Sequence, residues 1–434
     1  MIVPRNRLLI WFAIVALPFS VLAGAYPSAL AVSLLFVAAL LLLAGADAFL
    51  SRASLRGICL TAPALTRLAL ERDGEIELRV QNASCQPRRL RLALCMLEKF
   101  SMPDEELEVD LPGGAEWSKL TWPCRPGKRG NYRLESAHLE AASPLGFWSA
   151  RRAVPLSSEI RVYPNLRSER KGLTLMFRGG LGMHVQRQVG KGREFEKLRD
   201  YVPGDGSEDI HWKATARRGR PVTKVFQIER TQEVYVAIDA SRLSAREDAI
   251  EHQITTALLL GVAAEEQGDL FGLITFSDRV EKFVRARGGK SHYHDCREAI
   301  YALEPREVNP DFNDVSSFIR LHLRRRALVV FLTALDDPLL SESFVRNVDM
   351  IARQHLVLVN MVKPPGIAPI FSGGEVNDID DLYTQLGGHF RWHNLEEVGK
   401  LLQRRGVKFS AGEGGRMGLN LVSEYLAVKR RQLL

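Results

Sequence analysis

The residues of this chain that are best suited to chemistry lie between Gly190 and Arg230, where acids, bases and one histidine alternate without a long apolar run. Such a mixture can form a hydrolase-type centre or an anion site. Six side chains carry this potential: Glu194, Arg199, Asp205, His211, Lys213 and Arg217. The stretch has no adjacent nucleophile and base, no paired metal carboxylates and no phosphate loop. Since charges at such spacing more often hold a loop on a neighbouring surface, the main prediction is a structural or partner-binding surface, and a catalytic cluster is the alternative.

Large aromatic side chains are interleaved with these charges, at Phe195, Tyr201, Trp212 and Phe226. A solvated tether of similar charge normally lacks such anchors. The pattern therefore predicts an ordered polar surface.

The same stretch, GREFEKLRDYVPGDGSEDIHWKATARRGRPVTKVF, resembles the signature of a bacterial family known as domain of unknown function fifty-eight. The matching positions are Glu194, Phe195, Leu198, Arg199, Tyr201, Gly204, Asp205, Ile210, Trp212, Lys213, Ala216 and Arg217. Glu208 stands where the family has a basic residue, so a charge pairing carried over from the family is weakened there.

A second candidate site is the sequence Asp239-Ala-Ser-Arg-Leu-Ser244. It resembles the start of a von Willebrand factor A domain, whose D-x-S-x-S motif often holds Mg²⁺ together with later loop residues. A carboxylate and hydroxyls are hard oxygen ligands of the kind that Mg²⁺ prefers. Here Asp239 and Ser241 match, but Leu243 and Ala334 replace two ligands. We therefore expect no cofactor; Mg²⁺ would need a shifted loop that recruits Asp336.

Two smaller motifs favour plain structure. Arg287-Gly-Gly-Lys-Ser291 resembles the end of a phosphate loop, but its first glycine is replaced by Val284, so a simple loop is predicted. His292, Asp295 and Cys296 would share one face of a helix, yet no fourth zinc ligand is apparent. A helix start is the favoured interpretation.

The elements that must position Asp239 lie in residues 231–434, where strand-like and helical patterns alternate. Near-continuous apolar strands such as ALVVFLT and LVLVNMV predict a doubly wound, largely parallel α/β sheet, with Asp239 at the carboxyl end of a strand. The resemblance at Asp239–Ser244 implies that this sheet is of the von Willebrand factor A type. Ser244 to Glu247 reads as a capping box that opens a helix to Glu266. The segment 419–434 reads as an amphipathic helix whose basic end either touches anionic lipid or is solvated.

Residues 51–165 precede the connecting segment 166–230 and show short alternating strands separated by Gly and Pro turns. This pattern predicts an all-β, immunoglobulin-like sandwich. Nothing in it suggests catalysis, and a structural or docking role is predicted.

Residues 1–50 contain two apolar runs, 8–25 and 29–46, each about long enough to cross a bilayer core. They predict a transmembrane helical hairpin. Arg5 and Arg7 precede it and Arg52 and Arg56 follow it, which places both ends and the later domains in the cytoplasm, at a bacterial inner membrane. The alternative is a cleaved signal peptide, because 23–25 resembles a cleavage site.

The chain of 434 residues has a net charge of +8. The basic residues are spread along the chain, so we expect a membrane surface rather than nucleic acid as the anionic partner. Five cysteines without a C-x-x-C motif indicate buried, reduced thiols. The oligomeric state is left open.

The family resemblance implies a membrane-anchored protein encoded near a MoxR-type AAA+ ATPase. It leads to the expectation of a non-catalytic, cytoplasm-facing adaptor that works with such an ATPase in the assembly or maturation of envelope or other complexes. Two alternatives remain: a membrane-associated hydrolase-type enzyme that uses the Glu194–Lys213 cluster, and a Mg²⁺-dependent adhesion-type module. The missing nucleophile opposes the first alternative, and Leu243 and Ala334 oppose the second.

Overall fold

The computed structural model describes residues 1–26, 28, 30–95, 100–102, 106–178, 189–190, 194–203, 206–227, 231–370, 372 and 378–431. For 189–190, 194–197, 225–227 and 247 it describes the backbone alone. The chain divides into two compact units, 1–165 and 166–434.

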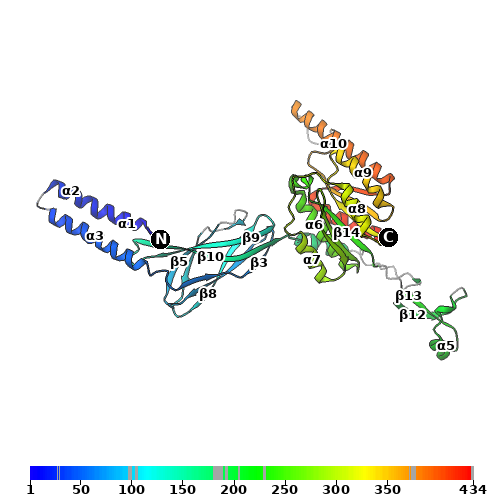
Figure 1. The fold of residues 1–434 in the computed structure, drawn as a ribbon, viewed down its shortest axis with the longest axis horizontal. Coiled ribbons are helices and arrows are strands. Elements are labelled where there is room, and N and C mark those ends of the chain that lie inside the picture. The colour runs from blue at the N-terminus through cyan, green and yellow to red at the C-terminus, as the bar shows by residue number, and fades with distance from the viewer. Residues whose placement is uncertain are drawn as a thin grey trace. The chain divides into compact units, whose positions relative to one another are not determined.

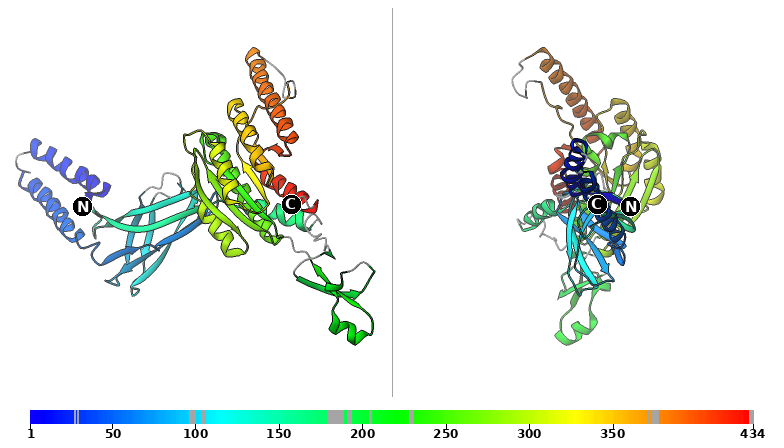
Figure 2. Two further views of the ribbon diagram at one scale, coloured as in Figure 1. Left: turned by 45° about the vertical axis from the view of Figure 1, so that its right-hand side comes forward. Right: turned by 90° about the vertical axis from the view of Figure 1, so that its left-hand side faces the viewer.

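The first unit begins with two helical segments that confirm the predicted apolar hairpin (Figure 1). The first comprises α1 (Asn6–Trp11), a π-helical turn (Phe12–Ala16) and α2 (Leu17–Ala25); the second is α3 (Leu30–Ser51), which ends five residues later than expected. Both are long and apolar enough to span a membrane. The π-turn precedes Pro18, which lacks the N–H that a regular helix would use. The helices run side by side, and the rings of Phe19 and Phe36 stack at 4.7 Å (Figure 2).

The rest of the first unit is made of β-sheets that are antiparallel, as predicted for this segment, except that β3 pairs with β10 in parallel. One sheet has the order β1-β10-β9-β5-β7, with β3 beside β10, and the other has the order β2-β4-β8-β6. The strands are β1 (Ile2–Pro4), β2 (Ile58–Thr61), β3 (Leu65–Ala69), β4 (Gly74–Asn82), β5 (Arg88–Leu94), β6 (Phe100–Ser101), β7 (Leu107–Leu111), β8 (Trp117–Pro126), β9 (Gly130–Ala142) and β10 (Trp148–Tyr163). Alternate residues such as Leu78 and Leu92 are buried in a common core. The short strand β1 was not predicted.

The second unit contains a six-stranded sheet of order β16-β15-β14-β17-β18-β19, parallel except for the edge strand β16. Its strands are β14 (Glu233–Asp239), β15 (Leu270–Phe276), β16 (Val280–Arg287), β17 (Ala327–Leu332), β18 (Leu356–Val362) and β19 (Lys408–Gly412). Its helices are α6 (Ala249–Glu266), α7 (Lys290–Ile300), α8 (Phe312–His322), α9 (Pro338–Ala352), α10 (Ile379–Arg404) and α11 (Gly414–Arg430). Apolar residues of α6, α7 and α11 cover one face, and those of α8, α9 and α10 cover the other. The predicted α/β organisation is confirmed.

The capping box predicted at Ser244 is wrong. Residues Arg242–Asp248 form a 3-10 helix, and α6 begins only after Asp248, whose φ is 54°. The Ser244 hydroxyl instead donates to the carbonyl oxygen of Asp239 at 2.6 Å and contacts Gln253 Oε1 at 3.2 Å. A tertiary contact has replaced the local motif.

The amphipathic helix predicted at the carboxyl end is present as α11, which begins earlier than expected, at Gly414. Leu421 and Tyr425 of α11 are buried against α6, together with Leu173 of α4 (Arg167–Met176). At its basic end, Lys429 pairs with the buried carboxylate of Asp269 at 2.8 Å, while Arg430 and Arg431 are exposed. The helix α11 is therefore part of the core.

Candidate functional site

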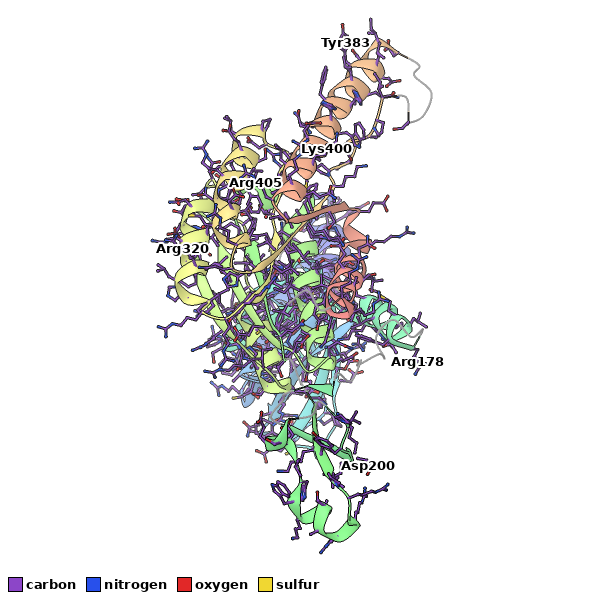
Figure 3. All side chains as sticks on the ribbon, turned by 90° about the vertical axis from the view of Figure 1, so that its right-hand side faces the viewer. Arg178, Asp200, Arg320, Tyr383, Lys400 and Arg405 are labelled. Atoms are coloured by element: carbon purple, nitrogen blue, oxygen red, sulfur yellow. The ribbon has the colours of Figure 1, made fainter. Side chains whose placement is uncertain are left out.

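The signature stretch folds as a small module of three antiparallel strands in the order β11-β13-β12. Its elements are β11 (Val189–Gly190), β12 (Glu194–Asp200), a 3-10 turn (Ser207–Asp209), α5 (Trp212–Arg218) and β13 (Val222–Gln227), labelled in part in Figure 1. An ion pair of 3.2 Å joins Arg220 to Asp200, which Figure 3 labels. The prediction of an ordered surface rather than a tether agrees with this fold.

The helix α5 is fixed at both ends by hydrogen bonds within the module. At its start, Nδ1 of His211 accepts from the backbone N–H of Ala214 at 3.1 Å. At its end, Gly219 adopts a left-handed conformation, with a φ of 68°, that closes the helix. The backbone N–H of Val222 donates to Thr215 Oγ1 at 3.1 Å, which ties α5 to the next strand. His211 is thus a helix cap whose Nδ1 already accepts a bond.

Besides these internal hydrogen bonds, the signature module presents several large side chains to solvent. Trp212 is 70% exposed and Tyr201 is 37% exposed. Lys213 and Arg217 are also exposed, and their four-residue spacing places them on one side of α5. Val222, in contrast, is fully buried and anchors β13. The module therefore displays an indole ring and two cations on a short ordered helix.

The remaining signature residues are placed only in part. Arg199 is half-buried on β12 and lies opposite Thr223. Glu194 and Phe195 belong to the backbone of β12, with side chains that lie outside the described residues, as do Gly204 and Asp205 entirely. Among the side chains that are described, neither His211 nor Lys213 is paired with a carboxylate. A catalytic acid–base arrangement is therefore not visible in this part of the module.

The strand-end aspartate Asp239 is fully buried, and both its carboxylate oxygens accept hydrogen bonds. Oδ1 accepts from the backbone N–H of Ser241 at 2.8 Å, and Oδ2 accepts from the hydroxyl of Thr333 at 2.5 Å. Burial raises the pKa of Asp239 above its ordinary value, and the hydrogen bonds from Thr333 and Ser241 only partly oppose that rise. The Ser241 hydroxyl accepts from the backbone N–H of Leu243 at 3.3 Å.

Two nearby acids that could complete a metal site face arginines instead. Nη1 of Arg246 lies 3.2 Å from Asp336 Oδ2, and Nη2 of Arg242 lies 3.4 Å from Asp337 Oδ2. The other Asp336 oxygen, Oδ1, is buried without a hydrogen-bond partner in the described part of the chain. Within that part, no three acidic, histidine or cysteine side chains gather closely enough to hold a metal ion. The two acids that follow β17 are thus paired with arginines of the loop that follows Asp239.

The other two sequence motifs are built into α7. The glycine pair of Arg287–Ser291 leads directly into this helix, with Gly289 at its start. His292 and Cys296 share a face, as expected, with 3.5 Å between Nε2 and Sγ. His292 Nε2 also contacts the carbonyl oxygen of Phe271 at 2.8 Å, and burial raises the pKa of the Cys296 thiol to about 12. A buried neutral thiol and a histidine held by the neighbouring strand favour a structural role.

An aspartate that the sequence analysis did not single out holds the first unit together. Asp47 lies in α3 and is fully buried. Its carboxylate accepts from Ser143 Oγ at 2.5 Å and from the backbone N–H groups of Leu145 and Phe147 at 3.0 and 3.1 Å, in the turn between β9 and β10. The Trp148 indole also donates to a carbonyl oxygen of α3 at 2.8 Å. The sequence does carry a signal for this contact. Asp47 is an acidic residue within a 22-residue apolar helix, and charged residues in such helices usually have a specific partner.

The helix α10 carries a second exposed apolar surface. Its residues Ile379, Leu382, Tyr383 and Phe390 are exposed, and Tyr383 is 66% exposed. Figure 3 shows Tyr383 on the part of α10 that extends beyond the sheet. This surface and the signature module are both available for contact with another protein.

A family model described as "Protein of unknown function DUF58" matches residues 197–368. This match confirms the resemblance and spans the end of β12, α5, β13 and most of the α/β sheet. A search of curated proteins finds no relative of the chain.

Among solved structures, BatB from Bacteroides thetaiotaomicron is 15% identical, with a TM-score of 0.30, over 46% of this chain and 99% of that one. An aerotolerance-related membrane protein from Bacteroides fragilis is 13% identical, with a TM-score of 0.31, over 45% and 98%. Proximal thread matrix protein 1 from the mussel byssus is 13% identical, with a TM-score of 0.25, over 45% of this chain and 46% of its own length.

Proposed function

We propose that this chain, whose residues 197–368 match the DUF58 family, is a non-catalytic membrane-anchored adaptor that presents its signature module to a partner protein. The observation that carries this proposal is the exposure of Trp212, at 70%, on a helix that is capped at both ends. The two apolar helices at the amino terminus support membrane association.

An exposed tryptophan on an ordered helix is well suited to protein recognition. Its ring offers a large contact area at a small cost in side-chain entropy, and tryptophan is enriched among the residues that dominate binding energies. Lys213 and Arg217, beside it on α5, add two positive charges that favour an acidic partner surface. The helix caps at His211 and Gly219 fix the helix before binding, so little ordering is needed on association.

The partner that we propose is a MoxR-type AAA+ ATPase, by resemblance to the family. Contact with it would not require a metal ion, because the carboxylate of Asp239 is already satisfied by Thr333 and Ser241. We further propose that the soluble domains lie on the cytoplasmic side of a bacterial inner membrane. The arginines that flank the helical hairpin support this orientation.

The test begins with a pull-down using the full chain in detergent, with ATP and with either Mg²⁺ or a chelator. The retained ATPase is then purified and its Kd for the chain is measured. Trp212→Ala is expected to weaken binding by about 30-fold or more, as for a central interface tryptophan. Trp117→Ala is the matched control, because Trp117 on β8 is also exposed, at 53%, but lies in the sandwich.

Further measurements decide which surface of the chain binds the ATPase and whether binding requires a metal ion. Tyr383→Ala removes an exposed aromatic of α10, and a selective loss of binding in this variant would move the docking surface from the signature module to α10. Equal binding by wild type, Trp212→Ala and Trp117→Ala would refute the role of the indole. Binding that disappears with the chelator, in the absence of any effect on the ATPase itself, would contradict metal independence.

A further inference from the structure

A cavity of about 510 Å³ lies in the first unit, where the amino-terminal strand and the start of α1 meet the sandwich. It is lined by Val3 to Arg7 on one side and by residues of β5, β9, β10 and the β9–β10 turn on the other. Its charged lining residues are Arg5, Arg7, Arg91, Arg151 and Glu140. Four guanidinium groups against one carboxylate give this cavity a strong preference for an anion.

Two of the four arginines are already neutralised. Arg151 Nε lies 2.6 Å from Glu140 Oε2, and Arg91 pairs with Glu108 at 2.9 Å. Burial alone would raise the pKa of Glu140, but the hydrogen bond and the charge of Arg151 act against it and that pKa lies below its ordinary value, so the carboxylate is charged at neutral pH. Among the described residues, no carboxylate pairs with Arg5 or Arg7. The positive excess therefore resides on these two side chains.

The structure holds both arginines in position. The backbone N–H of Arg5 donates to the carbonyl oxygen of Phe147 at 2.9 Å, and Ile2–Pro4 pairs with β10. Arg7 packs on the β9–β10 turn at Gly146, where a Cβ atom would lie 3.3 Å from Arg7 Nη1. Gly146 has a φ of +79°, a conformation that glycine adopts readily. The Arg7 guanidinium thus lies against the β9–β10 turn, and Asp47 of α3 fixes this turn by accepting hydrogen bonds from its backbone.

The cavity lies next to the segment that would enter the bilayer. Leu9, Ile10 and Phe12 lie shortly after Arg7 on α1 and the π-helical turn, and all three are exposed. Lipid acyl chains would cover these residues in a membrane. A lipid beside this helix would then carry its headgroup at the height of Arg5 and Arg7.

We propose that this cavity binds the phosphate of an anionic phospholipid headgroup, with Arg5 and Arg7 as its main ligands and Arg151 as a shared one. Guanidinium groups match phosphate oxygens with paired, charge-assisted hydrogen bonds. The site would fix the sandwich to the lipid surface, independently of the partner bound by the signature module.

The test measures lipid retention by the full chain in detergent, using native mass spectrometry with phosphatidylglycerol and, separately, phosphatidylcholine. Wild type is expected to retain phosphatidylglycerol preferentially. The double variant Arg5→Gln/Arg7→Gln is expected to lose about tenfold or more in affinity, because two charged hydrogen-bond donors are removed. The matched control is Arg52→Gln/Arg56→Gln, which removes the same charge at the other end of the hairpin without touching the cavity.

A second variant is expected to strengthen lipid binding, so it tests the proposal even if the double arginine variant does not fold. Glu140→Gln removes the competing carboxylate and releases Arg151, so retention of phosphatidylglycerol is expected to increase several-fold. Equal losses in the two arginine pairs, or no gain with Glu140→Gln, would overturn the proposal. Binding of inorganic phosphate alone, with no preference between the two lipids, would assign the cavity to a soluble anion and also overturn it.

Discussion

Replacing Asp239 by asparagine is expected to stabilise the α/β sheet at neutral pH, which is the reverse of what removing a metal ligand would do. The carboxylate is fully buried, and burial raises its pKa despite the hydrogen bonds from Thr333 and Ser241. A charged group in this position opposes folding. Asparagine keeps the shape and an acceptor for the Ser241 N–H, and its amide can donate to the Thr333 hydroxyl.

The sign of the pH dependence follows from proton linkage. Because the folded-state pKa of Asp239 lies above the ordinary value of about 3.9, the folded state binds more protons than the unfolded state between these two values. The stability of the wild type therefore falls as pH rises through this window and is level above it. The advantage of Asp239→Asn is expected to be largest above the raised pKa and to fade towards acid pH.

A functional metal site would give a different and larger response. With 10 mM Mg²⁺ and a dissociation constant of about 0.1 mM, binding would stabilise the folded state by about 2.7 kcal/mol. Amide exchange through global opening would then slow by about a hundredfold, since about 1.4 kcal/mol corresponds to a factor of ten. We expect no such change, because both oxygens of Asp239 already accept hydrogen bonds and Asp336 is paired with Arg246.

Hydrogen exchange of β14 and α6 in the full chain measures these effects. The comparison covers wild type and Asp239→Asn, with Mg²⁺ or chelator, over a range of pH. Asp278→Asn is the control, since Asp278 is half exposed and its hydrogen bond from Ser277 and the charge of Arg306 hold its pKa below the ordinary value. Protection of the wild type by Mg²⁺, or weaker protection of Asp239→Asn at pH 7.5, would refute the reasoning.

Two further substitutions test the contacts that join distant segments. Asp47→Ala leaves three donors of the β9–β10 turn without their acceptor, each at a cost of about 1–3 kcal/mol, so exchange and proteolysis at this turn should accelerate, and Asp47→Asn should restore part of the protection. Lys429→Ala removes the cation beside buried Asp269, and unfolding of the second unit should become easier by about 3 kcal/mol. Exposed Arg430→Ala is the control, and an equal effect from it would contradict the role of the ion pair.

Local patterns in the sequence were sufficient for most elements. The apolar runs near the amino terminus predicted two helices, although α3 extends to Ser51. Alternating residues predicted the β-sheets, and near-continuous apolar strands predicted the α/β sheet with β14 ending at Asp239. These predictions succeed because side-chain periodicity reports directly which face of an element is buried.

The details of the candidate sites depended on partners that are remote in sequence. Asp239 accepts a hydrogen bond from Thr333, 94 residues later, and Asp47 accepts one from Ser143, 96 residues later. His211 caps α5 although histidine is not a typical capping residue, so its residue type gave no signal. A three-residue strand such as Ile2–Pro4 has too few positions to show a period.

The sequence by itself determined the segment types, the charged and aromatic character of the signature and the family resemblance. Tertiary structure alone decided that Trp212 is exposed, that Asp47 holds the turn at Leu145, and that Arg5 and Arg7 share a cavity. The physical reason is that periodicity arises from neighbours along the chain. The pairing and exposure of individual side chains, in contrast, depend on which surfaces pack together from distant parts of the chain. Similar local sequence patterns are compatible with many such packing arrangements.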